Sequence, residues 1–247
     1  MSVNIYDSFD VWDQNKWDIK LNGGGRVTIT VENGKLVYRD TSTNTVPATS
    51  IIRSKQYFTL TKDKAKEIRV DVELPSPSGS FIAQNAFFVI TPSSVTDTWA
   101  QDMYQISFEN ISGQYRVGVS AMKNGQTVFS CEYKTVEKNY ATLRYVVEDD
   151  TIVFYVDNVE ICRDKYRLES REIAVWLETI MSGGCVVYWD NVATVGPSII
   201  EEFFTFLGGL LRQIVDLLMQ LMPVIIIIGI IGAVAGAFTI KKKKKKE

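Results

Sequence analysis

Two carboxylates at alternate positions, Asp71 and Glu73, are the clearest candidates for chemistry in this sequence. They stand in the segment 67–74, where apolar and polar residues alternate strictly, so both would lie on one face of a strand. A pair of carboxylates on one face can act as the acid and the nucleophile or base that cleave a glycosidic bond. Arg69 shares that face, however, and predicts that the two carboxylates are ion-paired on a solvated surface.

Several other kinds of site are excluded or weakened by composition. The chain has no histidine, which removes the commonest general base and metal ligand and any Ser/His/Asp arrangement. No Gly-rich turn leads from a strand into a helix, as a phosphate loop would require. No cofactor is predicted; calcium could be held only by scattered acids, namely Asp7, Asp10 and Asp190.

The three cysteines, Cys131, Cys162 and Cys185, show no CxxC spacing. We expect buried free thiols and neither a zinc site nor a full disulfide framework. One bridged pair remains open, because the sequence does not say which two cysteines would meet.

Aromatic residues in or next to predicted loops are a second kind of candidate. Their ring faces could stack on sugar rings, and packing in the core is the alternative. The residues concerned are Trp12, Trp17, Trp99 and Tyr104.

The elements that would position these residues are short strands. Turn signals such as Asn33-Gly34 and Asn124-Gly125 recur every 8–12 residues, and no segment before residue 199 has a helical period. This pattern predicts an all-β fold over residues 1–196, a two-sheet antiparallel sandwich. Since the net charge of the chain is −2 although six lysines stand together near the C terminus, the sandwich is mildly acidic and unsuited to nucleic acid.

The order of several short motifs resembles the concanavalin A-like lectin/glucanase superfamily, which includes the laminin-G-like jelly rolls. These motifs are Asp7-Ser-Phe9-Asp10, Val31-Glu-Asn-Gly34, Ile152-Val-Phe-Tyr-Val156 and Tyr188-Trp-Asp190-Asn191-Val192. The resemblance covers about residues 5–195 and implies a jelly roll whose last strand returns beside the first and whose concave face binds sugars. Glucanases of this superfamily carry Glu-x-Asp-x-Glu on one strand. The nearest match here has Arg69 at the first position, so the resemblance implies a lectin-like protein without the catalytic set.

Residues 197–222 predict an amphipathic stalk helix, for which Ser198 would be the N-cap. A heptad-like apolar seam predicts self-association, and additional apolar positions leave partial burial in a membrane interface open. The seam consists of Ile200, Phe203, Leu207, Leu210, Ile214, Leu217 and Leu221.

Residues 223–240 are uncharged and long enough to span a bilayer as a helix, which predicts a transmembrane anchor. Gly232 and Gly236 form a GxxxG site at which two such helices could meet. The tail 241–247 would contact lipid headgroups, or nucleic acid, through its lysines, Lys241, Lys242, Lys243, Lys244, Lys245 and Lys246. The N terminus has no secretory signal pattern, and the topology of the β domain remains open.

Together these features predict a non-enzymatic, membrane-anchored recognition or structural protein on a cell surface or a virion membrane, such as that of an archaeal virus. We expect a single-pass homo-oligomer whose partners are a bilayer and either a glycan or other surface or capsid proteins. Two alternatives remain: a membrane-bound glycoside hydrolase of the glucanase type, and an architectural capsid or envelope subunit that binds no sugar.

Overall fold

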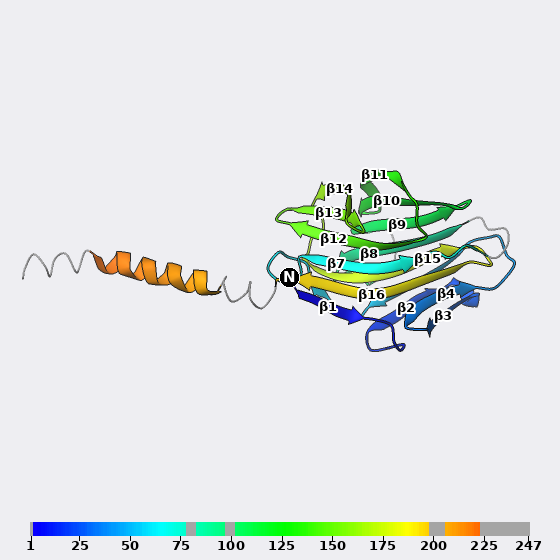
Figure 1. Ribbon diagram of the computed structural model, residues 1–247, viewed down its shortest axis with the longest axis horizontal. Coiled ribbons are helices and arrows are strands. Elements are labelled where there is room, and N and C mark those ends of the chain that lie inside the picture. Colours follow the sequence, from blue (N-terminus) through cyan, green and yellow to red (C-terminus); the bar gives the residue numbers. More distant parts are fainter. Residues whose placement is uncertain (1, 78–82, 97–101, 198–205, 223–247) are drawn as a thin grey trace, which may run out of the picture. The chain divides into compact units, whose positions relative to one another are not determined.

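The computed structural model describes residues 2–77, 83–96, 102–197 and 206–222, and it divides the chain into two compact units, Met1–Pro197 and Ser198–Glu247 (Figure 1). The first unit is a sandwich of two antiparallel eight-stranded sheets. The predicted all-β, two-sheet sandwich is therefore confirmed.

The first sheet is built around two central strands, β7 (Glu67–Glu73) and β16 (Val186–Gly196). β1 (Ser2–Asp7) pairs with the end of β16, so the last strand does return beside the first. The other strands run in the order β14 (Val159–Lys165), β13 (Thr151–Val156) and β12 (Tyr140–Glu148) on one side of this pair, and β4 (Lys35–Asp40) and β3 (Val27–Glu32) on the other.

The second sheet is built around β8 (Gln84–Pro92) and β15 (Glu172–Met181). Beyond β8 lie β9 (Met103–Ile111), β10 (Gln114–Lys123) and β11 (Gln126–Val136); beyond β15 lie β5 (Ala48–Ser54) and β2 (Trp17–Asn22), and β6 (Phe58–Thr59) also pairs with β15. A short 3₁₀ turn, Gly23–Gly25, connects β2 to β3.

The core lies between the two sheets because every second side chain of each strand points inward. Ile68, Val70 and Val72 of β7 are buried there, as the alternation predicts. Polar ring atoms in the core reach backbone carbonyls of the facing sheet: the Tyr145 hydroxyl donates to the Phe88 carbonyl at 2.5 Å. Such bonds satisfy buried hydroxyl groups and fix the spacing of the two sheets.

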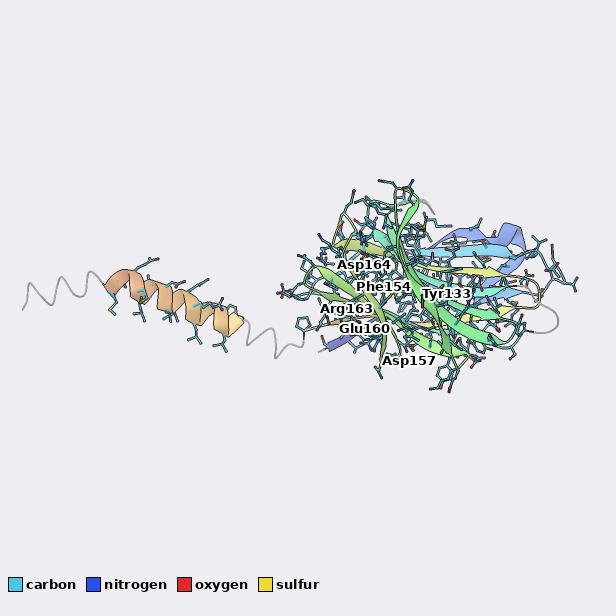
Figure 2. All side chains as sticks on the ribbon, turned by 90° about the horizontal axis from the view of Figure 1, so that it is seen from above. Tyr133, Phe154, Asp157, Glu160, Arg163 and Asp164 are labelled. Atoms are coloured by element: carbon cyan, nitrogen blue, oxygen red, sulfur yellow. A yellow bond between two sulfur atoms is a disulfide. The ribbon has the colours of Figure 1, made fainter. Side chains whose placement is uncertain are left out.

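A disulfide joins the two sheets along one edge. Cys131 of β11 and Cys162 of β14 are bonded, and these two edge strands contact each other. The Lys134 ammonium also donates to the Ile161 carbonyl at 2.7 Å. The two edge strands can be found in Figure 2 by their labelled residues, Tyr133 of β11 and Arg163 of β14. The expectation of free thiols is therefore wrong for two cysteines and holds for Cys185, which is buried and free.

In the second unit, residues 206–222 form a helix with most of its apolar side chains exposed. The seam residues from Leu207 to Leu221 lie on it, whereas Ile200, Phe203, Gly232, Gly236 and the lysine tail fall outside the described residues. No helix within the described ranges is long and apolar enough to cross a membrane.

Candidate functional site

The outer face of the second sheet carries an unusual mixture of buried polar and apolar side chains. We call it the second-sheet face, and it is formed by the outward residues of β5, β15, β8 and β9. Its apolar members form a cluster separate from the main core, namely Ile51, Phe87, Val89, Val95, Met103 and Trp176. All six are buried, so neighbouring groups shield this part of the face from solvent.

Glu178 of β15 is the most perturbed carboxylate of this face. Its side chain is 4% exposed, and among the described residues its Oε1 has no hydrogen-bond partner. Burial raises the pKa of Glu178 to about 8, because the apolar surroundings disfavour the charged form. Glu178 is therefore protonated at neutral pH and can donate a proton.

Glu109 of β9 is 5% exposed, and unlike Glu178 it has hydrogen-bond partners on both carboxylate oxygens. Its Oε2 accepts from the Arg116 guanidinium at 2.9 Å and its Oε1 from the Tyr133 hydroxyl at 2.9 Å. These charge-assisted and hydroxyl hydrogen bonds hold both oxygens of the carboxylate in place. The Tyr133 ring lies directly over Gly118, where a Cβ would come within 2.5 Å of the ring, so only glycine allows this placement.

Strand register fixes the spacing of the two glutamates. Glu178 pairs with Phe87 of β8, and Glu109 pairs with Asn85, two residues along the same strand. Their backbones are therefore separated by two strand spacings across the sheet, about 10 Å, and two residues along it, about 7 Å.

Two further polar groups on the second-sheet face lack partners within the described part of the chain. They are the Arg53 Nε atom and the Asn85 Oδ1 atom. Arg53 stacks between the rings of Tyr57 and Trp176, at 5.4 and 5.2 Å from their centroids, while another of its nitrogens donates to the Ser93 carbonyl. Three of the seven buried polar atoms that lack a partner among the described residues therefore lie on this face, where a ligand could bond to them.

The partly exposed residues of this face include Asn85, Gln105 and Ile180. Gln105, Ser107 and Glu109 stand at alternate positions of β9 and point outward, since Tyr104, Ile106 and Phe108 between them are core residues. This is the spacing of the glucanase pattern with glutamine and serine at its first two positions.

The predicted catalytic pair lies elsewhere, on the outer face of the first sheet. Asp71 and Glu73 line a surface groove of about 350 Å³, which we call the first-sheet groove. Glu73 is paired with Lys35 at 2.8 Å, and Arg69 pairs with Glu67. The expected ion pairing therefore occurs for Glu73, with Lys35 and not Arg69 as its partner, whereas the hydrogen-bond donors to Asp71 are neutral.

Asp190 faces Asp71 across the β7–β16 ladder in the same groove. Burial, and to a lesser degree the nearby Asp71, raise the pKa of Asp190 above its usual range. A β-bulge between Asp190 and Ala193 positions Asn191, whose side-chain amide donates to the Asp71 Oδ2 atom at 3.0 Å. The Thr142 hydroxyl donates to the other oxygen of Asp71 at 2.6 Å.

The aromatic candidates are placed differently from the expectation. Trp17, 2% exposed, packs in the core and donates from Nε1 to Asp7 at 2.7 Å. Tyr104 is fully buried in β9 and donates to the Lys165 carbonyl at 2.7 Å. Trp12 is partly buried against the core, and Trp99 lies outside the described residues. Stacking on sugars by Trp17 and Tyr104 is thus ruled out by burial.

The candidate calcium ligands are also engaged in other contacts. Asp7 accepts from the Phe9 amide as well as from Trp17, Asp10 accepts from the Ser8 hydroxyl, and Asp190 accepts from the Asn191 amide. Within the described ranges, no group of three or more acidic, cysteine or histidine residues could hold a metal ion.

Sequence reasoning missed Glu178 and Glu109. Alternation and composition predict strands over 173–177 and 104–108, and each glutamate lies just past the end of one of them. The available signal was a single charged residue within the apolar run Ile173-Ala-Val-Trp-Leu-Glu-Thr-Ile180. A charge in such a run lies on a buried face, where it is costly unless it has a function.

The sequence matches no protein-family model and no curated protein. Solved structures do match the fold. The β-glucanase of Bacillus licheniformis aligns with a TM-score of 0.53 and 11% identity over 77% of this chain and 97% of that one. The laminarinase catalytic domains of Thermotoga petrophila and Thermotoga maritima each align with a TM-score of 0.56 and 13% identity, over 80% of this chain and 99% and 100% of theirs.

These matches confirm the resemblance to the concanavalin A-like jelly rolls and correct the expected function. The similar structures are enzymes, named as glucanases and laminarinases, whereas we expected a non-enzymatic recognition protein. The glucanase-type alternative agrees better with these neighbours. At identities this low, the likeness establishes the fold, and an activity has to be argued from this chain's own residues.

Proposed function

Starting from the concanavalin A-like jelly roll that this chain shares with glucanases, we propose that it is a glycoside hydrolase acting on a β-linked glucan. The observation that carries the proposal is the pair Glu178 and Glu109 on the second-sheet face. Burial raises the pKa of Glu178 to about 8, as an acid requires, and Arg116 and Tyr133 hold both oxygens of Glu109 in place, as a positioned base requires.

In the proposed mechanism Glu178 is the general acid and Glu109 the general base. Glu178 donates its proton to the glycosidic oxygen as the bond to the anomeric carbon breaks. Glu109 removes a proton from the water that attacks this carbon from the opposite side. The products are two shorter chains, and the anomeric configuration inverts.

Inversion is favoured over a covalent intermediate for two reasons. Gln105 occupies the first position of the outward pattern on β9, and an amide is no nucleophile for this reaction. The backbone spacing of the two glutamates also leaves room for a water between their carboxyl groups. In inverting enzymes in general, the two carboxyl groups lie about 6.5–9.5 Å apart.

The test is hydrolysis of a β-1,3- and mixed-linkage glucan panel by the full-length protein. We expect Glu178→Gln and Glu109→Gln each to reduce the rate at least 100-fold, in line with the loss of a general acid or base. Glu172→Gln, at the exposed start of the same strand, should retain the rate. The wild-type rate should fall as pH rises through about 8, since Glu178 then loses its proton.

The proposal fails if no glucan is cleaved, or if Glu178→Gln cleaves as fast as the wild type. Proton NMR of the first product formed separates the mechanisms, because a product of retained configuration would exclude the single displacement by water that Glu109 is proposed to assist.

We further propose that residues 223–240 tether this activity to a bilayer and that the helix 206–222 associates with copies of itself. The proposal is supported by the uncharged stretch followed by six lysines and by the exposed apolar residues of the helix.

A further inference from the structure

The first-sheet groove is separate from the proposed catalytic face and has its own features of a binding site. It crosses four neighbouring strands, β12, β7, β16 and β4, a span of about 14 Å at ordinary strand spacing. A second hollow of about 350 Å³ continues it and shares Tyr140, Thr142 and Asp157. Together they can hold several linked rings.

Tyrosine rings and acidic side chains alternate along this groove. Tyr140 is 52% exposed, and Tyr188 is half-exposed beside Lys35, whose ammonium lies 5.4 Å from the ring centroid. Asp157 accepts from the Thr142 amide through Oδ1, and Asp190 accepts from the Asn191 amide through its own Oδ1. The second oxygen of each carboxylate has no hydrogen-bond partner among the described residues, and both residues line the groove.

The charges of the groove select among ligand classes. Asp71, Asp157 and Asp190 would repel an anion, and Lys35 and Glu73 neutralise each other. The cations of the second hollow are also engaged, because Arg69 and Arg144 pair with Glu67 and Lys138 lies over the Tyr140 ring. A metal ion is disfavoured because Asp71 has both oxygens bonded by neutral donors and Glu73 is paired with Lys35. Exposed rings beside fixed hydroxyl acceptors suit a neutral sugar chain, whose ring faces stack and whose hydroxyls donate.

We infer that the first-sheet groove is a second carbohydrate site, which binds a neutral glucan chain without cleaving it. Tyr140 and Tyr188 supply the stacking surfaces, and Asp157 and Asp190 accept from sugar hydroxyls. Because the groove lies on the opposite sheet, it would hold one part of a polysaccharide while another part reaches the second-sheet face. The inference does not depend on catalysis.

The experiment measures binding of neutral β-1,3- and β-1,4-linked glucan hexasaccharides to the full-length Glu178→Gln protein by calorimetry and by hydrogen exchange. We expect added protection of β7, β12 and β16 and at least a tenfold loss of affinity in this site on changing Tyr140 and Tyr188 together to alanine. The matched control is Tyr155→Ala on β13, a half-exposed ring of the same sheet outside the groove.

The inference is overturned if no hexasaccharide binds the Glu178→Gln protein. It is also overturned if the double-alanine variant binds as tightly as this parent protein and shows the same exchange pattern. Hydrolysis is scored separately. Binding lost with the tyrosines in a protein that cleaves no glucan would support this site and reject the proposed catalysis. In an active enzyme the double-alanine variant should cleave insoluble glucan more slowly and a short soluble substrate at the wild-type rate.

Discussion

At the scale of single residues, Glu178 is the side chain that most strongly links stability to function. Its pKa is raised from 4.5 to about 8 by burial alone. The folded protein therefore binds a proton that the unfolded chain has already released between these values. The contribution of Glu178 to the free energy of unfolding is fully present below pH 4.5 and is lost as pH rises toward 8.

This linkage predicts a difference between the wild type and Glu178→Gln. The free energy of unfolding of the wild type should fall by about 1.4 kcal/mol per pH unit over this window relative to the variant, which cannot ionise there. Urea unfolding at pH 5, 6, 7 and 8 measures the difference, with Glu172→Gln as control. Parallel pH profiles for wild type and Glu178→Gln would mean that Glu178 is ionised throughout.

At the scale of elements, the disulfide between β11 and β14 is the covalent link between the two sheets. These strands are the outer strands of their sheets, so without the bond the sandwich is held at this edge by side-chain contacts alone. One such contact is the stacking of Phe129 of β11 on Phe154 of β13, with centroids 6.2 Å apart.

Replacing both Cys131 and Cys162 by serine should therefore destabilise the fold. The bond closes a loop with a sequence separation of 31, for which chain entropy alone gives about 3–4 kcal/mol. Thermal unfolding of the oxidised wild type, the reduced wild type and the double variant measures this. Cys185→Ser serves as a control for the third, buried cysteine. Equal midpoints for the oxidised protein and the double variant would contradict the prediction.

The strands themselves were readable from the sequence, and the reasons are visible in particular segments. β7 alternates Ile68, Val70 and Val72 with polar residues, and the turn Asn33-Gly34 has positive φ at both residues, as the dipeptide predicts. The cysteine pairing was not readable, because it depends on which edge strands of two different sheets meet. The partners of Asp71 were hidden for the same reason: Thr142 and Asn191 come from distant segments.

At the scale of the whole molecule, the chain consists of two units with different surfaces. The sandwich buries its own core, whereas the helix 206–222 exposes apolar residues such as Leu210, Ile214 and Leu217. We expect a protein ending at Pro197 to unfold at the same temperature as the sandwich of the full chain and to remain in the aqueous phase with liposomes. The full chain should float with the liposomes.

Calorimetry and sucrose-gradient flotation check this pair of expectations. A lower midpoint for the shortened chain would show that the sandwich depends on residues 198–247. A full chain that stays at the bottom of the gradient would contradict the proposed tether. Changing Ile214→Glu and Leu217→Glu together tests the helix alone, since the two charges interrupt its apolar surface without shortening the chain.

The pairing of Ser2 with Gly196 has a consequence for how the chain could be rewired. Entry and exit of the sandwich lie within one strand spacing of each other, about 4.8 Å. A linker of a few residues could join them, and the chain could be opened at the Asn124-Gly125 turn without breaking a ladder. Such a circular permutant would keep every strand neighbour while its ends emerged at a different hairpin.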